Sequence, residues 1–138
     1  MLKKLILVLL FIGTSFWSCE DNQSNQLEEI SPNSFIGVWN LSSFGFYSDS
    51  NCNGDLEIIA YSGTLTVTET DIINDFYYNG QPAFKDTTNY TLDGTTICLI
   101  TDSQVCGTLE VTETNMKILI PEFENDGEVE CLSIVGVK

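Results

Sequence analysis

Cysteine is the residue type whose spacing in this chain most directly predicts chemistry. The chain has 138 residues and five cysteines, four of which follow residue 50. An even number of cysteines in an exported protein is typical of disulfide bonding, and four cysteines allow three pairings. Cys98 and Cys106 flank a predicted hairpin loop over residues 99–105, which would place them opposite each other on adjacent strands, within bridging distance. This arrangement leaves Cys52 to pair with Cys131, joining an early loop to the last predicted strand.

The stretch DSNCNGDLEIIA, residues 49–60, has some of the residue types of an EF-hand calcium loop. Asp49, Asn51 and Gly54 fit successive ligand and turn positions, but Ala60 stands where the bidentate Glu of such a loop belongs. We therefore favour an Asx-rich turn over a calcium site. A zinc site has even less support because the chain has no His and no C-x-x-C spacing. We expect neither a metal nor another cofactor.

Catalytic chemistry has little support in the sequence. His is the side chain most often used for general acid and base catalysis near neutral pH, and the chain has none. Ser-His-Asp and Cys-His arrangements are therefore impossible, and no glycine-rich phosphate loop occurs. We expect that the protein is not an enzyme.

The first residues have the pattern of an export signal. Lys3 and Lys4 form a short positive region, and an apolar run begins at residue 5. This run ends by Trp17, well short of the roughly 20 residues that a membrane-spanning helix needs. We therefore expect residues 1–18 to be a signal peptide.

Ser18-Cys19, at the end of this signal, resembles the lipobox of bacterial lipoproteins. In that family a small residue precedes a cysteine that is thioether-linked to diacylglycerol and becomes the new N-terminus. The resemblance implies that Cys19 is the lipid attachment site and that N-terminal acyl chains anchor the protein to a membrane. Glu20 and Asp21 resemble the acidic export signal of surface-displayed lipoproteins, which implies an outer-membrane protein at the periplasmic face or the cell surface. The alternative is an ordinary cleaved signal peptide followed by an incidental cysteine.

The charge of the mature chain argues against nucleic acid and anionic lipid surfaces as partners. Removal of residues 1–18 leaves three lysines against 20 acids, and 3 − 20 gives a net charge of −17. Nucleic acid is excluded because three scattered lysines cannot form the basic footprint that phosphate binding needs. The same negative charge repels anionic lipid head groups, so we expect membrane attachment to be covalent.

The composition divides the mature chain into a tether and one domain. Residues 19–33 comprise the predicted lipidated cysteine and a polar, acidic segment with too few apolar side chains to bury a face. As a flexible coil this tether would have a root-mean-square reach of about 20 Å. Residues 34–138 then form a single domain, since a chain of this length supports one hydrophobic core.

Turn dipeptides punctuate the domain, and between them lie runs rich in Val, Ile, Thr, Tyr and Phe. The dipeptides are Asn53-Gly54, Ser62-Gly63, Asn79-Gly80, Asp93-Gly94 and Asp126-Gly127. Alternating apolar and polar residues between such turns are typical of antiparallel hairpins. The predicted strands cover residues 36–47, 55–61, 63–70, 72–78, 84–92, 95–101, 105–112, 115–121 and 128–137.

These strands predict an all-β fold. We expect an antiparallel up-and-down meander of about eight to nine strands that closes into a small barrel, because closure removes the exposed sheet edges. A barrel of about eight strands can be filled by its own side chains or can hold one small ligand.

The first predicted strand carries a resemblance to the lipocalins. Gly37-Val38-Trp39 matches their G-x-W signature, and Leu41 follows on the same face as the Trp. The resemblance implies a lipocalin-like β-barrel over residues 34–138, in which Trp39 plugs the closed end and Gly37 gives the backbone room to bend. Lipocalins usually place an Arg from a late strand over this Trp, and this chain contains no Arg.

Several aromatic side chains could line a cavity in such a barrel, because ligand pockets are mostly apolar with few polar groups. The candidate ligand-binding residues are Trp39, Phe76, Tyr78, Phe84 and Tyr90. The predicted function is that of a lipid-anchored, exported, lipocalin-like protein that binds a small hydrophobic ligand. The alternative is a structural or protein-interaction lipoprotein of the cell envelope, with a filled barrel and a protein partner.

Overall fold

The computed structural model describes residues 31–138 as one short helix and nine β-strands. The predicted signal peptide, Cys19 and nearly all of the predicted tether lie outside the described residues. The elements are α1 (Pro32–Phe35), β1 (Gly37–Tyr47), β2 (Leu56–Ile58), β3 (Tyr61–Val67), β4 (Asp71–Tyr78), β5 (Gln81–Asp93), β6 (Thr96–Ile100), β7 (Gln104–Val111), β8 (Asn115–Asn125) and β9 (Glu128–Val137). Within the described part of the chain, no helix has the length and apolar character needed to cross a membrane.

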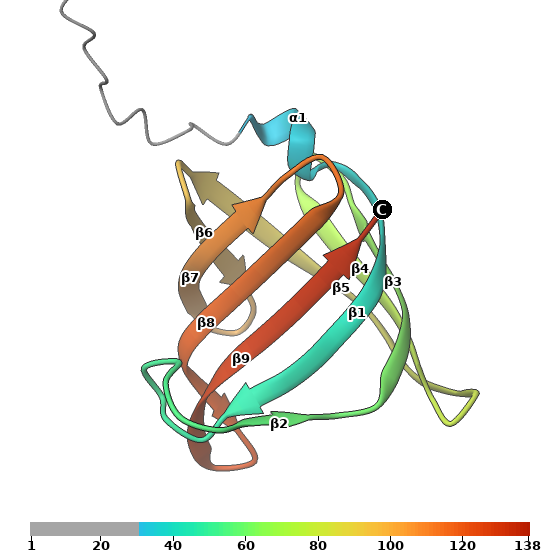
Figure 1. The fold of residues 1–138 in the computed structure, drawn as a ribbon. Coiled ribbons are helices and arrows are strands. Elements are labelled where there is room, and N and C mark those ends of the chain that lie inside the picture. Colours follow the sequence, from blue (N-terminus) through green and yellow to red (C-terminus); the bar gives the residue numbers. More distant parts are fainter. Residues whose placement is uncertain (1–30) are drawn as a thin grey trace, which may run out of the picture.

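The strands form a closed antiparallel barrel, as predicted. Neighbouring strands follow the order β2-β1-β3-β4-β5-β6-β7-β8-β9, and β1 also pairs with β9, which closes the sheet (Figure 1). The barrel wall therefore consists of eight strands, β1 and β3 to β9, connected up and down. β2 is the extra strand, and it pairs only with the end of β1, where Tyr47 lies opposite Leu56.

The period-2 pattern of the sequence decides which side chains fill this barrel. Leu65 and Val67 alternate along β3 with threonines, and both are almost completely buried. Leu109 on β7 is equally buried, and so is Ile118, which lies opposite it on β8. Successive residues of a strand point to opposite faces, so one row of each strand enters the core and the other faces water.

Three of the five predicted turn dipeptides lie between strands, and Asp93-Gly94 spans the end of β5, whose last residue is Asp93. Asn79 and Asp126 adopt positive φ angles of 50° and 48°, and each is followed by a glycine with positive φ, which is the geometry of tight two-residue hairpin turns.

The predicted turn at Ser62-Gly63 is wrong, because β3 runs through it. Gly63 has a φ of 131°, and a Cβ atom there would overlap the backbone oxygen of Asp75 on β4. The glycine therefore permits close approach of two paired strands rather than a chain reversal.

Both cysteine pairs predicted from the spacing are disulfide-bonded. Cys98 lies directly opposite Cys106 on the β6–β7 hairpin, with their Cα atoms 4.0 Å apart. Cys52 bonds to Cys131 across a sequence separation of 79 and joins the β1–β2 loop to β9. In that loop the backbone N–H of Asn51 donates to Asp49 Oδ1 at 2.8 Å, which is an Asx turn.

Candidate ligand-binding site

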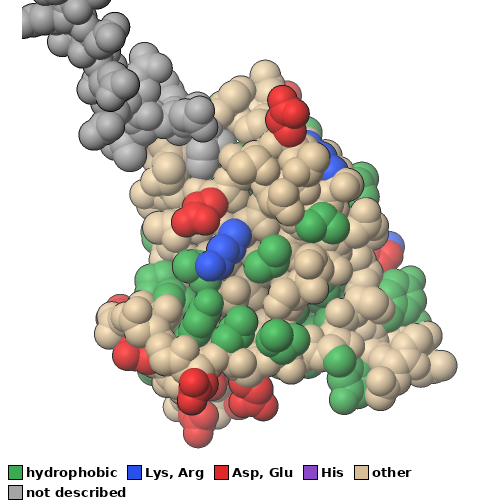
Figure 2. All heavy atoms as spheres, in the orientation of Figure 1, with side chains coloured by type: hydrophobic (Ala, Val, Ile, Leu, Met, Phe, Trp, Pro, Cys, Tyr) green, Lys and Arg blue, Asp and Glu red, His purple; other side chains and the backbone are tan. Residues whose placement is uncertain are grey.

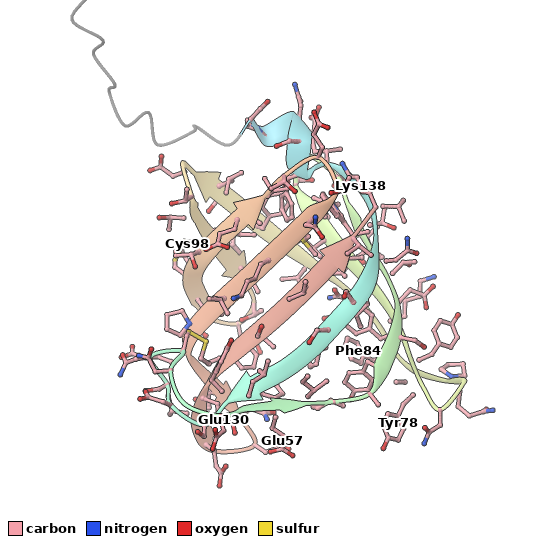
Figure 3. All side chains as sticks on the ribbon, in the orientation of Figure 1. Glu57, Tyr78, Phe84, Cys98, Glu130 and Lys138 are labelled. Atoms are coloured by element: carbon pink, nitrogen blue, oxygen red, sulfur yellow. A yellow bond between two sulfur atoms is a disulfide. The ribbon has the colours of Figure 1, made fainter. Side chains whose placement is uncertain are left out.

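The five aromatic residues predicted from the sequence fall into two groups at different places in the barrel. Trp39 and Tyr90 lie near α1, where the C-terminal Lys138 is also found (Figure 3). Phe76, Tyr78 and Phe84 lie on the β4–β5 hairpin. Tyr78 and Phe84 are away from α1 (Figure 3). The two groups have different exposure and different partners.

Trp39 fills the end of the barrel next to α1, which we call the closed end. Its side chain is fully buried, and its Nε1–H donates to the backbone oxygen of Phe35 at 2.8 Å. Lys138 Nζ lies 4.3 Å from the centre of the Trp39 ring and donates to the Ser34 oxygen at 3.3 Å. The chain thus places a lysine where the lipocalin resemblance implies an arginine. Gly136 leaves room for the Trp39 side chain, since a Cβ atom there would lie 3.0 Å from Trp39 Cβ.

Tyr90 belongs to the same closed end. It is buried, its ring packs edge-on against Phe35 at 5.5 Å, and its hydroxyl donates to the Thr68 oxygen at 2.7 Å. Burial raises the pKa of the Tyr90 hydroxyl, and the nearby carboxylates of Asp71 and Glu69 raise it further. Trp39 and Tyr90 therefore fill the closed end, and the polar group of each side chain has a hydrogen-bond acceptor.

Phe76, Tyr78 and Phe84 come together with two further aromatic residues, Tyr61 and Phe44, which the sequence did not predict. The Phe76 and Phe84 rings, which lie opposite each other in register, are 4.8 Å apart. Tyr61 from β3 contacts the rings of Phe76, Phe84 and Tyr78 at 6.1, 5.7 and 5.9 Å. Phe44 from β1 lies 5.7 Å from Phe76. Phe84 and Tyr78 remain 37% and 48% exposed.

The barrel wall is incomplete beside this aromatic cluster. β5 pairs with β6 only over residues 89–93, although its first part pairs with β4. β8 pairs with β7 only over residues 116–119, and the rest of β8 pairs with β9 alone. Residues 81–88 of β5 and 120–125 of β8 therefore border an opening in the wall, which we call the side window. The β6–β7 turn, residues 101–103, bounds the window at one end.

A cavity of about 210 Å³ lies at the side window. Residues from both borders of the window line it, together with residues from the barrel interior, and most of them are apolar. The apolar lining residues are Phe44, Phe76, Phe84, Leu99, Phe123, Leu132 and Ile134. Since an apolar cavity of about 150 Å³ can bind a benzene-sized molecule, this one can hold a ring with a short substituent.

The same cavity has a polar wall on the β4–β5 hairpin. Asn74 and Asp86 lie opposite each other in register, and Thr88 and Thr101 lie nearby on the lining. Asn74 Oδ1 is buried and has no hydrogen-bond partner among the described residues. The Asp86 side chain is exposed, and its Oδ1 accepts from the backbone N–H of Thr87 at 2.8 Å. An apolar cavity with a few converging polar groups is typical of a small-molecule site.

Two further hollows flank this cavity. An internal void of about 30 Å³, large enough for one water molecule, shares Asn74 and Thr88 with it. A shallow groove of about 450 Å³ lies at the tip of the β4–β5 hairpin, where Tyr61 and Tyr78 line it together with Pro82. Tyr78 thus contributes to the outer groove, whereas Phe76 and Phe84 contribute to the cavity.

The charges around the cavity are negative. Lys85 is on the outer face of the barrel, where its Nζ lies 3.6 Å from Asp75 Oδ2. Lys117 is paired in register with Glu110, and Lys138 covers Trp39 at the closed end. Acidic side chains are spread over the face seen in Figure 2, and exposed hydrophobic side chains lie mostly in its lower half. Within residues 31–138, no group of three or more His, Cys, Asp or Glu side chains could hold a metal ion.

The alternation rule could have found two of the missed site residues. Asn74 is two residues before Phe76, and Asp86 is two residues after Phe84, so each lies on the same strand face as a predicted aromatic residue. Tyr61 could not be found in this way because its contact with the cluster depends on the register between β3 and β4.

No protein-family model, curated protein or solved structure matches this chain. The fold is a small eight-stranded antiparallel barrel that is consistent with a lipocalin-like architecture.

Proposed function

We propose that this protein is a lipid-anchored, exported, lipocalin-like lipoprotein that binds a small ligand with an apolar body and catalyses no reaction on it. The observation that carries the proposal is the cavity of about 210 Å³ at the side window, with its mostly apolar lining. Phe76 and Phe84 form its aromatic wall, and Tyr78 extends the apolar surface outward along the hairpin. Trp39 and Tyr90 hold the closed end in shape.

The exported location is supported by the pattern of the first 19 residues and by the two disulfides, because disulfides persist in oxidising compartments. In this proposal Cys19 carries the acyl chains, the residues between Cys19 and α1 are the tether, and the barrel stands at the periplasmic face of the outer membrane or at the cell surface.

Calorimetric titration of the protein isolated from cells, held in lipid nanodiscs, tests the ligand site. The probe is 4-phenylbutanol, whose single ring and short chain suit the cavity, and empty nanodiscs correct for partition into lipid. We expect saturable binding that Phe84→Ala weakens about tenfold, because the substitution removes apolar contact area from the ligand.

Tyr77→Ala is the matched control. Tyr77 is 37% exposed, as Phe84 is, but it adjoins Phe76 in β4 and so points to the opposite face of the same hairpin. It should bind the probe like the wild type. Absence of saturable binding, or equal losses in the two variants, would refute the proposed site.

Mass spectrometry of the mature N-terminus tests the anchor separately. We expect a chain that begins at Cys19 with a diacylglyceryl group on its sulfur, and we expect Cys19→Ala to move the protein out of the membrane fraction. Recovery of the chain with residues 1–18 attached would rule out the lipoprotein assignment.

A second candidate function is protein binding, favoured by exposed apolar side chains that do not line the cavity. Ile58 on β2 and Val129 on β9 are 63% and 55% exposed. A protein partner that contacts these side chains would be lost when both are replaced by Asp, and Phe84→Ala would leave that partner bound.

A further inference from the structure

The polar wall of the cavity indicates the head group of the ligand. We propose that the cavity selects an apolar amine, with the cationic nitrogen directed at Asn74 and Asp86, over a carboxylic acid with the same body. This inference rests on the proposed function, since it assigns chemistry to the ligand of the same cavity.

Asn74 supplies the first observation. Asn74 lines the cavity, and its Oδ1 atom is buried and has no hydrogen-bond partner among the described residues. A buried acceptor without a donor is costly and uncommon in folded proteins. A ligand that brings an N–H group into the cavity removes that cost, whereas a carboxylate brings only acceptors.

Asp86 supplies the second observation. It lies opposite Asn74 in register, lines the same cavity and belongs to the border of the side window. Its carboxylate is an acceptor and carries a negative charge, so it attracts an ammonium group and repels a carboxylate. Hydrogen bonds between an ammonium and a carboxylate are stronger than those between neutral groups.

The placement of the lysines supplies the third observation. Lys85, Lys117 and Lys138 are the described cationic side chains, and none of them lines the cavity. Lys85 lies beside Asp75 on the outer face, and Lys138 covers Trp39 at the closed end. An anionic head group in the cavity would therefore meet Asp86 without any counter-charge.

The size of the cavity limits the rest of the ligand. A volume of about 210 Å³ holds one ring and a short alkyl chain, and the Phe76–Phe84 pair offers that ring an aromatic wall. The ligand class is thus a small arylalkyl or alkyl amine with its nitrogen at the β4–β5 hairpin.

A series of three probes with one body and three head groups tests the inference. Dissociation constants of 4-phenylbutylamine, 4-phenylbutanol and 4-phenylbutanoate are measured by calorimetry at pH 7, with the protein isolated from cells in nanodiscs and with empty nanodiscs as the blank. We expect the amine to bind at least about tenfold more tightly than the acid, with the alcohol between them.

Equal binding of the three probes would overturn the head-group inference and leave the apolar site intact. Tightest binding of the acid would overturn it as well. Binding of none of them would refute the proposed function together with the inference, so the two failures are distinguishable.

Two variants locate the selectivity. Asp86→Asn keeps the size of the side chain and should reduce the amine-to-acid affinity ratio about fivefold. Asp75→Asn removes the same charge from the outer face of the same hairpin and should change the ratio less than about twofold, because Asp75 does not line the cavity and its charge is already paired with Lys85. Equal effects would mean that only the overall charge matters, which contradicts the inference.

Asn74→Leu tests the buried acceptor. The variant should fold with unchanged or higher thermal stability, since it removes an unpartnered polar atom. Its affinity for the amine should fall about tenfold, and its affinity for the alcohol should fall less. If a water molecule in the adjoining void of about 30 Å³ were the partner of Asn74, amine affinity would be unchanged, and Asn74 would have no part in recognition.

Discussion

The closed end and the side window belong to one barrel but are stabilised in different ways. At the closed end, Trp39 is fully buried, its nitrogen has an acceptor, and Lys138 covers its ring. At the side window, Phe84 is more than one-third exposed, and within residues 31–138 the side-chain oxygen Oδ1 of Asn74 has no hydrogen-bond partner. The first region satisfies its own packing and hydrogen bonds, and the second leaves both incomplete.

The disulfides follow the same division. The Cys98–Cys106 bond lies on the hairpin whose turn borders the window, and the Cys52–Cys131 bond ties the β1–β2 loop to β9, the strand that also carries Leu132 on the cavity wall. The described part of the closed end has no such bond. Strands that border the side window have fewer paired neighbours. The two disulfides stabilise this part of the barrel against unfolding, and the cavity can therefore remain open.

The largest expected effect comes from removing the long cross-link. Cys52→Ser with Cys131→Ser frees a loop with a separation of 79 residues, and the chain-entropy relation assigns this a loss of about 4.5 kcal/mol. The matched pair, Cys98→Ser with Cys106→Ser, has a separation of 8 and should lose about 2.5 kcal/mol. Urea unfolding of both variants measures the difference, and a larger loss from the short bond would contradict this account.

The next effect separates packing from binding. Trp39→Ala should lower the free energy of unfolding by about 3–5 kcal/mol, because it leaves a cavity in a filled region. Phe84→Ala should lower it by only about 1–2 kcal/mol, because part of that ring is already exposed.

Affinity for 4-phenylbutanol should respond in the opposite way. Phe84→Ala should bind the probe more weakly than the wild type, and Trp39→Ala should bind it almost as tightly as the wild type. If Trp39→Ala does not fold, Trp39→Phe replaces it. A closed-end substitution that abolished probe binding in a folded protein would show that the two regions are not independent.

Features that depend on local sequence were predicted better than features that depend on strand pairing, and the reason is physical. Trp39 was recognised because a local signature fixes a local role, and the Cys98–Cys106 pair because a hairpin places its two sides opposite each other. The all-β class, the number of strands and most turns likewise follow from local patterns. The error at Ser62-Gly63 also has a local cause, since a glycine that permits close strand approach has the same sequence signal as a turn glycine.

The window could not be predicted because it depends on how far each strand continues to pair. β5 begins at Gln81, three residues before its predicted start, and extends past the end of β6. That mismatch in strand length creates the opening, and no single segment encodes it. The placement of Lys138 over Trp39 also escaped prediction, because it depends on the register between β1 and β9.

A smaller effect concerns Tyr90 and depends on pH. Tyr90→Phe removes the hydroxyl that donates to the Thr68 oxygen and should cost about 1 kcal/mol near neutral pH. The pKa of the wild-type hydroxyl is raised above its usual value of 10.0, first by burial and then by Asp71 and Glu69. A raised pKa means that the folded protein holds this proton more tightly than the unfolded chain does.

The resulting stability is fully present below the unfolded pKa and is lost as pH rises through the folded pKa. The difference in unfolding free energy between wild type and Tyr90→Phe should therefore shrink above about pH 10. Unfolding curves measured across that range check it. A difference that stays constant would mean that Tyr90 does not carry this alkaline sensitivity.

The smallest expected effect concerns Lys138, which covers Trp39 where the lipocalin resemblance implies an arginine. Lys138→Met keeps most of the apolar stem but removes the charge over the ring and the donor to the Ser34 oxygen, so it should cost about 0.5–1 kcal/mol. In a domain of this size such a loss lowers Tm by about 2–8 °C.

Lys138→Arg should retain stability, because a guanidinium stacks on an aromatic face and keeps a donor for the same oxygen. Lys117→Met, which removes a lysine from the outer face, controls for net charge and should leave Tm nearly unchanged. Equal shifts in Lys138→Met and Lys117→Met would mean that the closed end is held by Trp39 and Phe35 alone, and that the cation adds only solubility.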